Sequence, residues 1–285
     1  MTTQLTKANQ PSQAMMKLKS VLNTDSVKEQ FQNALQENAG AFVASVIDLY
    51  GSDNYLQQCD PNAVVMEALK AATLKLPINK QLGFAYIVPY KSQGKQVPQF
   101  QLGYKGYIQL AMRTGQYRHL NAGIVREGMK VDRDILTGEI KITGDPTNDK
   151  AQGYFAYMEL LNGFSKTVYM TLEEVLNHAK RYSKSFNFTN SAWKTNFDEM
   201  AIKTVLRRLL SKYGFLSTEM VAAFTSDTES DIESEVAAEV ANEANQDVID
   251  ITAEPVDELS KEKEQENKQE SKKTTGQIKM EGPGF

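Results

Sequence analysis

The stretch GFAYIVPYKSQGKQVPQFQLG, residues 83–103, marks the point where the hydrophobic period of the chain changes. Its two arms, residues 83–90 and 97–103, are rich in aromatic and β-branched side chains and flank the polar turn KSQGKQ. Such arms around a short glycine-containing turn predict a β-hairpin. Apolar residues on both sides of this hairpin follow helical spacing, so the hairpin separates two groups of elements.

The region before the hairpin is expected to be helical. Apolar residues recur every four positions from residue 27, and a second helix is expected over residues 41–50. Asp60 followed by Pro61 is a favourable N-cap and N1 combination, so a third helix is expected to begin there. Residues 1–23 are polar, rich in glutamine and without a clear period, and are expected to form a mobile N-terminal arm.

The region after the hairpin mixes both periods. Residues 104–114 return to helical spacing, and strand-like segments follow at residues 122–127, 139–143, 153–161 and 166–170. Thr171 and Glu174 form a capping box that opens another helix, and a long helix is expected over residues 191–213. Helices on both sides of a β centre indicate an α+β fold, with helices packed on a mostly antiparallel sheet and β-hairpins.

Charge divides the chain near Thr225. Residues 1–225 contain 26 basic and 19 acidic residues, and residues 226–285 contain 6 and 17, so a part of net charge +7 precedes one of −11. The second part is too charged and too poor in apolar side chains to offset its ordering entropy by burial. We therefore expect a folded core over residues 24–225 and an acidic, mostly disordered tail over 226–285. Apolar residues four apart make part of the tail a candidate partner-binding turn; these are Ile232, Val236 and Val240.

The amino-acid composition limits which disulfides and metal sites the protein can form and in which cell compartment it is expected. The single cysteine, Cys59, excludes an internal disulfide and fits a reducing compartment. With only His119 and His178 beside it, a zinc site of usual composition is not expected. The chain has neither a long apolar run nor a signal-peptide pattern. We therefore expect a cytoplasmic protein that does not contact a membrane.

Two windows of the chain are strongly basic. Residues 68–126 contain nine Lys or Arg and no Asp or Glu, and residues 175–218 contain eight against two acids. Seven aromatic residues lie within the first window. A surface of one charge sign with aromatic rings beside it suits single-stranded nucleic acid, whose phosphates bind cations and whose bases stack.

The first group of candidate DNA-binding residues lies on the helix after the hairpin. Lys105, Gln109 and Arg113 step by four and share one face. We expect this face to form one wall of a DNA-binding groove. Tyr104 and Tyr107 lie beside Lys105 and are candidates for stacking on bases, with packing in the core as the alternative.

The second group lies on the last long helix. Lys203 with Arg207, and Arg208 with Lys212, are like-charged pairs at i, i+4, each unfavourable by about 0.2–0.5 kcal/mol. A bound phosphate backbone would offset that repulsion. An ion pair with Glu199, four residues earlier, is the alternative role of Lys203.

Trp193 opens that last helix and is expected to be a core anchor rather than a stacking platform. The remaining basic candidates come from the two windows. The full set of candidate DNA-binding residues is Lys105, Gln109, Arg113, Arg118, Lys194, Lys203, Arg207, Arg208, Lys212, Tyr104 and Tyr107.

Catalytic signals are weak. The nearest approach to a phosphate-binding loop, residues 123–129, has Met129 where a lysine belongs and no strand-to-helix switch around it. Four aspartates in the β region could serve a metal-dependent nuclease, although turn-forming is their commoner role; these are Asp132, Asp134, Asp145 and Asp149. We expect no catalytic, cofactor or metal site.

Two blocks of the sequence resemble a known family. The block FQLGYKGYIQLAMRTGQYR (residues 100–118), preceded by LGFAYIVPY, and the block WKTNFDEMAIKTVLRRLLSKY (residues 193–213) are similar to core blocks of RecT-type single-strand annealing proteins of phages and prophages. The resemblance spans about residues 27–224. It implies annealing of complementary DNA strands without ATP or another cofactor, assembly into rings or helical filaments, and work beside a partner exonuclease. A host single-strand-binding protein is a further expected partner.

Annealing requires that the protein hold DNA backbones while leaving bases readable. Basic side chains would grip one strand through its phosphates, and base pairing would select the second strand from solution. Two alternatives remain open: a metal-dependent nuclease, and a passive single-strand-coating protein that does not anneal. The sequence does not distinguish a coating protein from an annealing protein.

Overall fold

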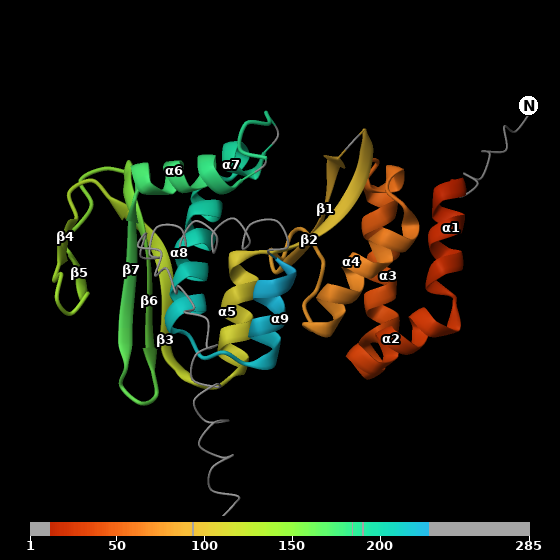
Figure 1. The fold of residues 1–285 in the computed structure, drawn as a ribbon, viewed down its shortest axis with the longest axis horizontal. Coiled ribbons are helices and arrows are strands. Elements are labelled where there is room, and N and C mark those ends of the chain that lie inside the picture. Colours follow the sequence, from red (N-terminus) through yellow and green to blue (C-terminus); the bar gives the residue numbers. More distant parts are fainter. Residues whose placement is uncertain (1–11, 93, 184, 190, 228–285) are drawn as a thin grey trace, which may run out of the picture. The chain divides into compact units, whose positions relative to one another are not determined.

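The computed structural model of the protein describes residues 12–227, apart from residues 93, 184 and 190 (Figure 1). In this described part the strands form the antiparallel pairs β1–β2 and β4–β5 and the three-stranded antiparallel sheet β3–β6–β7. The predicted α+β class is therefore confirmed. Residues 1–11 of the predicted arm and residues 228–285 of the predicted tail lie outside the described residues.

Helices make up the N-terminal part of the fold: α1 (Gln13–Leu22), α2 (Asp25–Leu35), α3 (Ala39–Ser52) and α4 (Pro61–Thr73), with the 3-10 turns η1 (Gln36–Asn38) and η2 (Leu56–Gln58) between them. Leu18, Phe31 and Val46, one from each of the first three helices, are buried in the same core as the apolar face of α4. Helix α4 begins at the predicted Asp60–Pro61 pair.

The expectation of a mobile arm is wrong for residues 13–22. These residues form α1, whose N-cap Ser12 accepts a hydrogen bond on its Oγ from the backbone N–H of Met15 at 3.2 Å. Leu18 and Leu22 lie one turn apart and are buried, and the helix packs against α3 and α4. Polar residues on the outer faces of α1 obscure this short apolar spacing in the sequence.

The predicted hairpin is present as β1 (Ala85–Ser92) and β2 (Lys95–Leu102), and it leads directly into α5 (Tyr104–Arg113). Helix α4 packs against both strands. The start of α5 lies so close to the hairpin that a Cβ on Gly103 would overlap the carbonyl oxygen of Gly83, and one on Gly106 that of Phe84. Glycine at these two positions fixes the junction between hairpin and helix.

The central sheet contains β3 (Tyr117–Arg126), β6 (Ala151–Leu160) and β7 (Ser165–Thr171). Between β3 and β6 the chain forms the smaller pair β4 (Lys130–Arg133) and β5 (Ile140–Thr143). The sequence predicted β5 but missed β4, which is only 4 residues long. Tyr154, Ala156 and Met158 alternate along β6 and are buried on one face of the sheet.

The remaining helices are α6 (Leu172–Tyr182), α7 (Ala192–Thr195), α8 (Phe197–Tyr213) and α9 (Thr218–Ser226). The capping box of Thr171 and Glu174 opens α6 as predicted. Helix α8 packs against all three strands of the central sheet, and it buries Val205 and Leu209. Among the described helices, none is both long and apolar enough to span a membrane.

Two boundaries differ from the sequence-based expectation. The single helix expected over residues 191–213 is divided at Asn196, whose φ of −139° and ψ of 53° are not helical, so α7 and α8 are separate. The core also extends past residue 225, because α9 packs on α5 and Asp227 is 92 % buried, with 8 % of its surface exposed. Asp227, assigned above to the tail, therefore belongs to the folded core.

Candidate nucleic-acid interface

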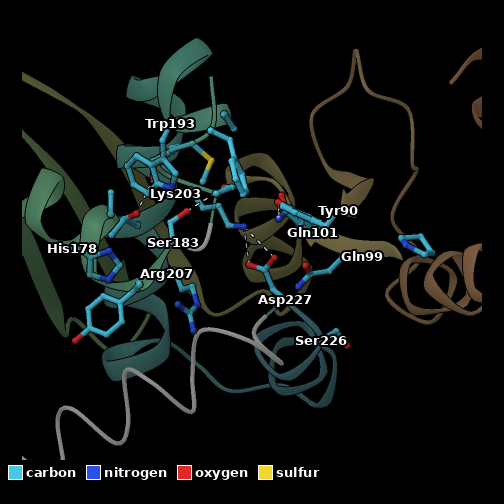
Figure 2. Close-up of a pocket in the computed structure, with 18 of the residues that line it drawn as sticks. Tyr90, Gln99, Gln101, His178, Ser183, Trp193, Lys203, Arg207, Ser226 and Asp227 are labelled. Carbon is cyan, nitrogen blue, oxygen red and sulfur yellow. Dashed lines mark hydrogen bonds and ion pairs between the residues drawn. The ribbon is translucent and has the colours of Figure 1, made fainter. Parts of the chain in front are cut away.

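A groove of about 540 Å³ lies between the β1–β2 hairpin with α4 on one side and α6, α7 and α8 on the other (Figure 2). The end of α9 also contributes, through Ser226 and Asp227. The two basic windows of the sequence supply most of the two sides: the hairpin and the end of α4 lie in the first window, and most of α6 lies in the second with α7 and α8. The fold therefore brings both windows to one site.

The groove carries positive charge. Its described lining includes five basic side chains: Lys70, Lys91, Lys203, Arg207 and Arg208. Two acidic residues lie among them, and each is in an ion pair: Glu67 with Lys70 at 3.1 Å, and Asp227 with Lys203 at 2.9 Å. The lining thus has an excess of positive charge, which suits an anionic polymer.

Aromatic side chains lie beside these cations: Tyr90, Tyr182, Phe188 and Trp193. Phe188 is 61 % exposed and offers a ring face to a ligand, whereas Trp193 is only 6 % exposed. Trp193 packs edge-on to Phe197 with ring centroids 5.7 Å apart and approaches Phe186 at 6.4 Å. Trp193 is therefore a core anchor, as the sequence predicts, and Phe188 is the better stacking candidate.

Asp227 organises the end of the groove where α9 arrives. Its carboxylate accepts hydrogen bonds from the backbone N–H of Leu102 at 2.8 Å and from the hydroxyl of Tyr107 at 2.7 Å. It also pairs with the Lys203 ammonium, at 3.1 and 2.9 Å from its two oxygens (Figure 2). These contacts join β2, α5 and α8, because the three partners lie on those elements. The ion pair that the structure gives Lys203 is thus to Asp227, not to Glu199.

Tyr107 is fully buried, so its ring is out of reach of a DNA base, and the stacking prediction for it is wrong. The ring stacks instead on Phe224 of α9, with centroids 5.5 Å apart. Burial, and then the Asp227 carboxylate, raises the pKa of the Tyr107 hydroxyl well above its usual value, while the positive charge of Arg207 and a hydrogen bond with it oppose that rise. The alternative of core packing holds for this residue.

Among the cations predicted on α8, Lys203, Arg207 and Arg208 line the groove, whereas Lys212 does not. Arg208 also reaches toward the central sheet, where its Nη1 donates to the Met170 sulfur at 3.6 Å. Three of the four basic residues predicted on this helix therefore meet at one site, and their DNA contacts stay a prediction.

The face of α5 does not form the second wall that the sequence suggested, because none of Lys105, Gln109 and Arg113 lines the groove. Arg113 has a structural role: its guanidinium donates to the carbonyl oxygens of Leu74 and Lys75 at 2.8 and 2.9 Å, at the end of α4. The second wall is the β1–β2 hairpin instead, since helical spacing cannot reveal which element a face meets.

The other predicted residues also lie outside the groove lining. Arg118 pairs with Glu159 on β6 at 2.7 Å. The Lys194 ammonium lies 4.7 Å from the Phe186 ring centroid, and that of Lys105 lies 6.0 Å from the ring of the partly buried Tyr104. Each of these exposed cations has a local partner, which explains its position without DNA.

Sequence reasoning missed other residues that the structure places in the groove, notably Lys70, Lys91 and Phe188. Lys70 and Lys91 belong to the first basic window, so their charge was visible. That these two lysines lie opposite α8 could not be read from the sequence, because it depends on how the hairpin packs. Phe188 follows α6 in a polar stretch, where a single exposed aromatic is the available signal.

The aspartates considered for a nuclease do not converge in the groove. Asp134 closes a turn by accepting from the backbone N–H groups of Thr137 and Leu136, and these hydrogen bonds lower its pKa. Asp149 lies 3.6 Å from Arg126. Within the described residues, no group of three or more His, Cys, Asp or Glu side chains is arranged to hold a metal ion.

Comparison with known proteins places these features in a family context. A model of the RecT family matches residues 40–242. The chain is 47 % identical over 214 residues to the uncharacterized protein YqaK of Bacillus subtilis (strain 168), covering 75 % of this chain and 72 % of that protein. It is 31 % identical over 216 residues to protein RecT of Escherichia coli (strain K12), covering 73 % of this chain and 79 % of that protein.

Proposed function

This chain belongs to the RecT family, and from that premise we propose that it binds single-stranded DNA in the basic groove and anneals complementary strands. The family supports a role in recombination through single-strand annealing. The finer parts of the proposal are the place of binding, the independence from ATP and the assembly of protomers along DNA.

The observation that carries the proposal is the meeting of five basic side chains and an exposed aromatic ring in one groove. Lysine and arginine bind phosphates of any sequence, as an annealing protein requires. Phe188 can stack on a base, and stacking tolerates every base because each has a π-face. This combination favours a single strand, whose bases are accessible, over a closed duplex.

In the proposed mechanism the cations hold the backbone of the first strand, so its bases remain free to pair. A complementary strand then approaches from solvent, and hydrogen bonding between bases decides whether it stays. The protein contributes by holding the first strand extended and by reducing the repulsion between the two backbones.

Independence from ATP fits the geometry around residues 123–129. These residues run from β3 into the turn before β4, so no helix follows to place its N-terminus at a phosphate, and Met129 occupies the lysine position. We therefore propose that the energy for annealing comes from base pairing alone.

Assembly follows from the size of the site. A groove of about 540 Å³ can hold only a short piece of a DNA strand, so we expect one protomer to bind weakly. Many protomers on one strand would bind tightly, because each contact raises the effective concentration of the next. We propose a homo-oligomer, either a ring or a helical filament, that works on DNA inside the bacterial cell. A partner exonuclease would supply its single strands, and a host single-strand-binding protein is a second proposed partner.

The test is an annealing reaction with purified protein and two complementary oligonucleotides, without ATP or magnesium. We expect duplex to form faster than without protein, as followed by quenching of a dye pair on the two strands. Tight binding without faster duplex formation would identify a passive coating protein. Shortened strands after magnesium is added would support the nuclease alternative.

A further inference from the structure

The described chain ends inside the groove rather than on a remote surface. Ser226, the last residue of α9, and Asp227 both line it. Asp227 is held by Leu102, Tyr107 and Lys203, so the last described residue is anchored at the groove wall. Whatever follows residue 227 starts beside the basic side chains.

The segment that follows is strongly acidic. Residues 228–239 contain five acids and no Lys or Arg; the acids are Glu229, Asp231, Glu233, Glu235 and Glu239. The first four alternate with other residues. In an extended chain, alternate side chains point to the same side and lie about 6.7 Å apart, so these four carboxylates can form a single negative row.

The groove already accepts a carboxylate from this end of the chain. Asp227 neutralises Lys203, whose side chain is only 17 % exposed. Lys91, Arg207 and Arg208 line the same groove. A row of carboxylates that starts at residue 229 would therefore carry charge complementary to these lining cations, as a DNA backbone does.

We propose that residues 228–239 occupy the basic groove when DNA is absent, so that a single strand must displace them to bind. This inference rests on the proposed function in one respect, that the groove is the DNA site. Twelve extended residues reach at most about 40 Å, enough to follow the groove from its α9 end. Because the segment is tethered there, its effective concentration is in the millimolar range, and modest attraction is sufficient for occupancy.

The consequence is an apparent affinity for DNA below the intrinsic one. If the groove is open in only a fraction of molecules, the apparent dissociation constant rises by the inverse of that fraction. The attraction is between charges at the surface, so it weakens as salt shortens the screening length. Occupancy of the groove by the protein's own acidic segment would favour the binding of long single strands, on which many protomers bind together, over the binding of short fragments.

The first experiment compares two full-length variants of equal charge. One carries Glu229→Gln, Asp231→Asn, Glu233→Gln and Glu235→Gln. The matched control carries Glu262→Gln, Glu264→Gln, Glu266→Gln and Glu270→Gln, four acids in a stretch that also contains lysines. Both variants gain the same net charge, so only the position of the neutralised residues differs. Binding to a fluorescent thymine homopolymer, which cannot pair with itself, is measured by anisotropy at low and high salt.

We expect the first variant to bind about threefold to tenfold more tightly than wild type at low salt, which corresponds to a groove that is open in roughly a third to a tenth of wild-type molecules. The control should gain much less, and the difference should shrink at high salt. An equal gain in both variants would indicate a bulk charge effect and overturn the inference. Unchanged affinity in the first variant would overturn it as well, while DNA binding itself would leave the proposed function standing. Absence of DNA binding in all three proteins would instead refute the proposed function.

A second experiment needs no DNA. A carbodiimide joins a carboxylate to a lysine amine only when the two touch, and mass spectrometry identifies the joined peptides. We expect links between the 229–235 peptide and Lys91 in wild type, lost at high salt and in Lys91→Arg, whose guanidinium keeps the charge but does not form the amide. Added thymine homopolymer should also remove the links. If the acidic segment never joins a groove lysine, the inference is wrong whether or not the groove binds DNA.

Discussion

At the scale of single residues, Asp227 and Tyr107 connect the groove to the core. The Tyr107 hydroxyl donates to Asp227, which also accepts from Leu102 and pairs with Lys203. A buried carboxylate is tolerated only when its oxygens have such partners, because an unpaired buried charge costs several kcal/mol. The same contacts hold Lys203 in the groove, so the groove's charge depends on buried residues behind it.

The raised pKa of Tyr107 predicts a loss of stability at alkaline pH. Burial, and next the Asp227 carboxylate, keeps this hydroxyl protonated in the folded state above pH 10, where it ionises in the unfolded chain. The contribution of this hydroxyl to the free energy of unfolding is complete below about pH 10. It is lost as pH rises above that value, by up to about 1.4 kcal/mol per pH unit. Urea unfolding followed by Trp193 fluorescence should therefore show a shallower alkaline decline in Tyr107→Phe.

The control for that experiment is Tyr55→Phe, because the Tyr55 side chain is 62 % exposed. This variant should keep the wild-type decline of unfolding free energy with pH. Tyr107→Phe also loses a hydrogen bond and starts from lower stability, so the decisive quantity is the slope rather than the absolute value. Parallel curves for wild type and Tyr107→Phe would show that other groups control the alkaline transition.

The two groove arginines of α8 predict a change in salt dependence. Replacing Arg207 and Arg208 by Ala removes two proposed phosphate contacts, so the slope of log affinity against log salt for a single strand should decrease in magnitude by about 1.4. Lys130→Ala with Lys141→Ala removes the same charge from β4 and β5, outside the groove, and should change the slope much less. Because Arg207 interacts with Tyr107, Arg208→Ala alone serves as a variant that leaves the Tyr107–Asp227 contacts in place. An unchanged slope in both arginine variants would place DNA elsewhere.

At the scale of elements, the junction of hairpin and α5 depends on glycine. A Cβ at Gly106 would overlap the Phe84 carbonyl oxygen and approach Leu102 Cδ1 at 2.7 Å, whereas a Cβ at Gly40 in α3 would meet nothing within 4 Å. We expect Gly106→Ala to lower the free energy of unfolding by about 1–3 kcal/mol through overpacking. Gly40→Ala should raise it by about 0.5–1 kcal/mol, because alanine favours an exposed helix. Chemical denaturation measures both, and equal effects would contradict the packing at the junction.

Elements marked by local chemistry could be predicted from the sequence, and the others could not. The hairpin, the Asp60–Pro61 start of α4 and the Thr171 capping box each have a signature within a few residues. In α1 only Leu18 and Leu22 are buried, and neither Gly nor Pro marks the break at Asn196. For the groove, the sequence correctly grouped three cations of α8 at one site. It wrongly predicted that the basic face of α5 forms the other wall. That assignment depends on contacts between residues 70–101 and 178–227, which no local pattern encodes.

At the scale of the whole molecule, the two basic windows become one surface while the acidic part of the chain stays separate in sequence. The overall charge of −4 hides this division, because the net +7 of residues 1–225 and the −11 of residues 226–285 nearly cancel. If the groove binds DNA as proposed, charge separated in this way would let one chain attract DNA there and hold its own acidic residues 228–239 as a competing anion. Under that proposal, long single strands would displace the acidic segment at many protomers at once, and binding should therefore depend steeply on strand length.

The proposed mechanism predicts a preference for DNA that is annealed on the protein. A groove that holds one backbone extended can admit a pairing strand from solvent, but a relaxed duplex presents two backbones already wound around each other. When complementary strands are added in sequence, anisotropy should therefore report tighter binding than for the same duplex formed beforehand. A non-complementary second strand is the control, and it should leave the complex with the first strand unchanged. Protomer assemblies, followed by light scattering, should be largest on sequentially added complementary strands, because pairing holds neighbouring protomers in register. Equal affinity for the preformed duplex would identify an ordinary duplex-binding protein and would refute annealing in the groove.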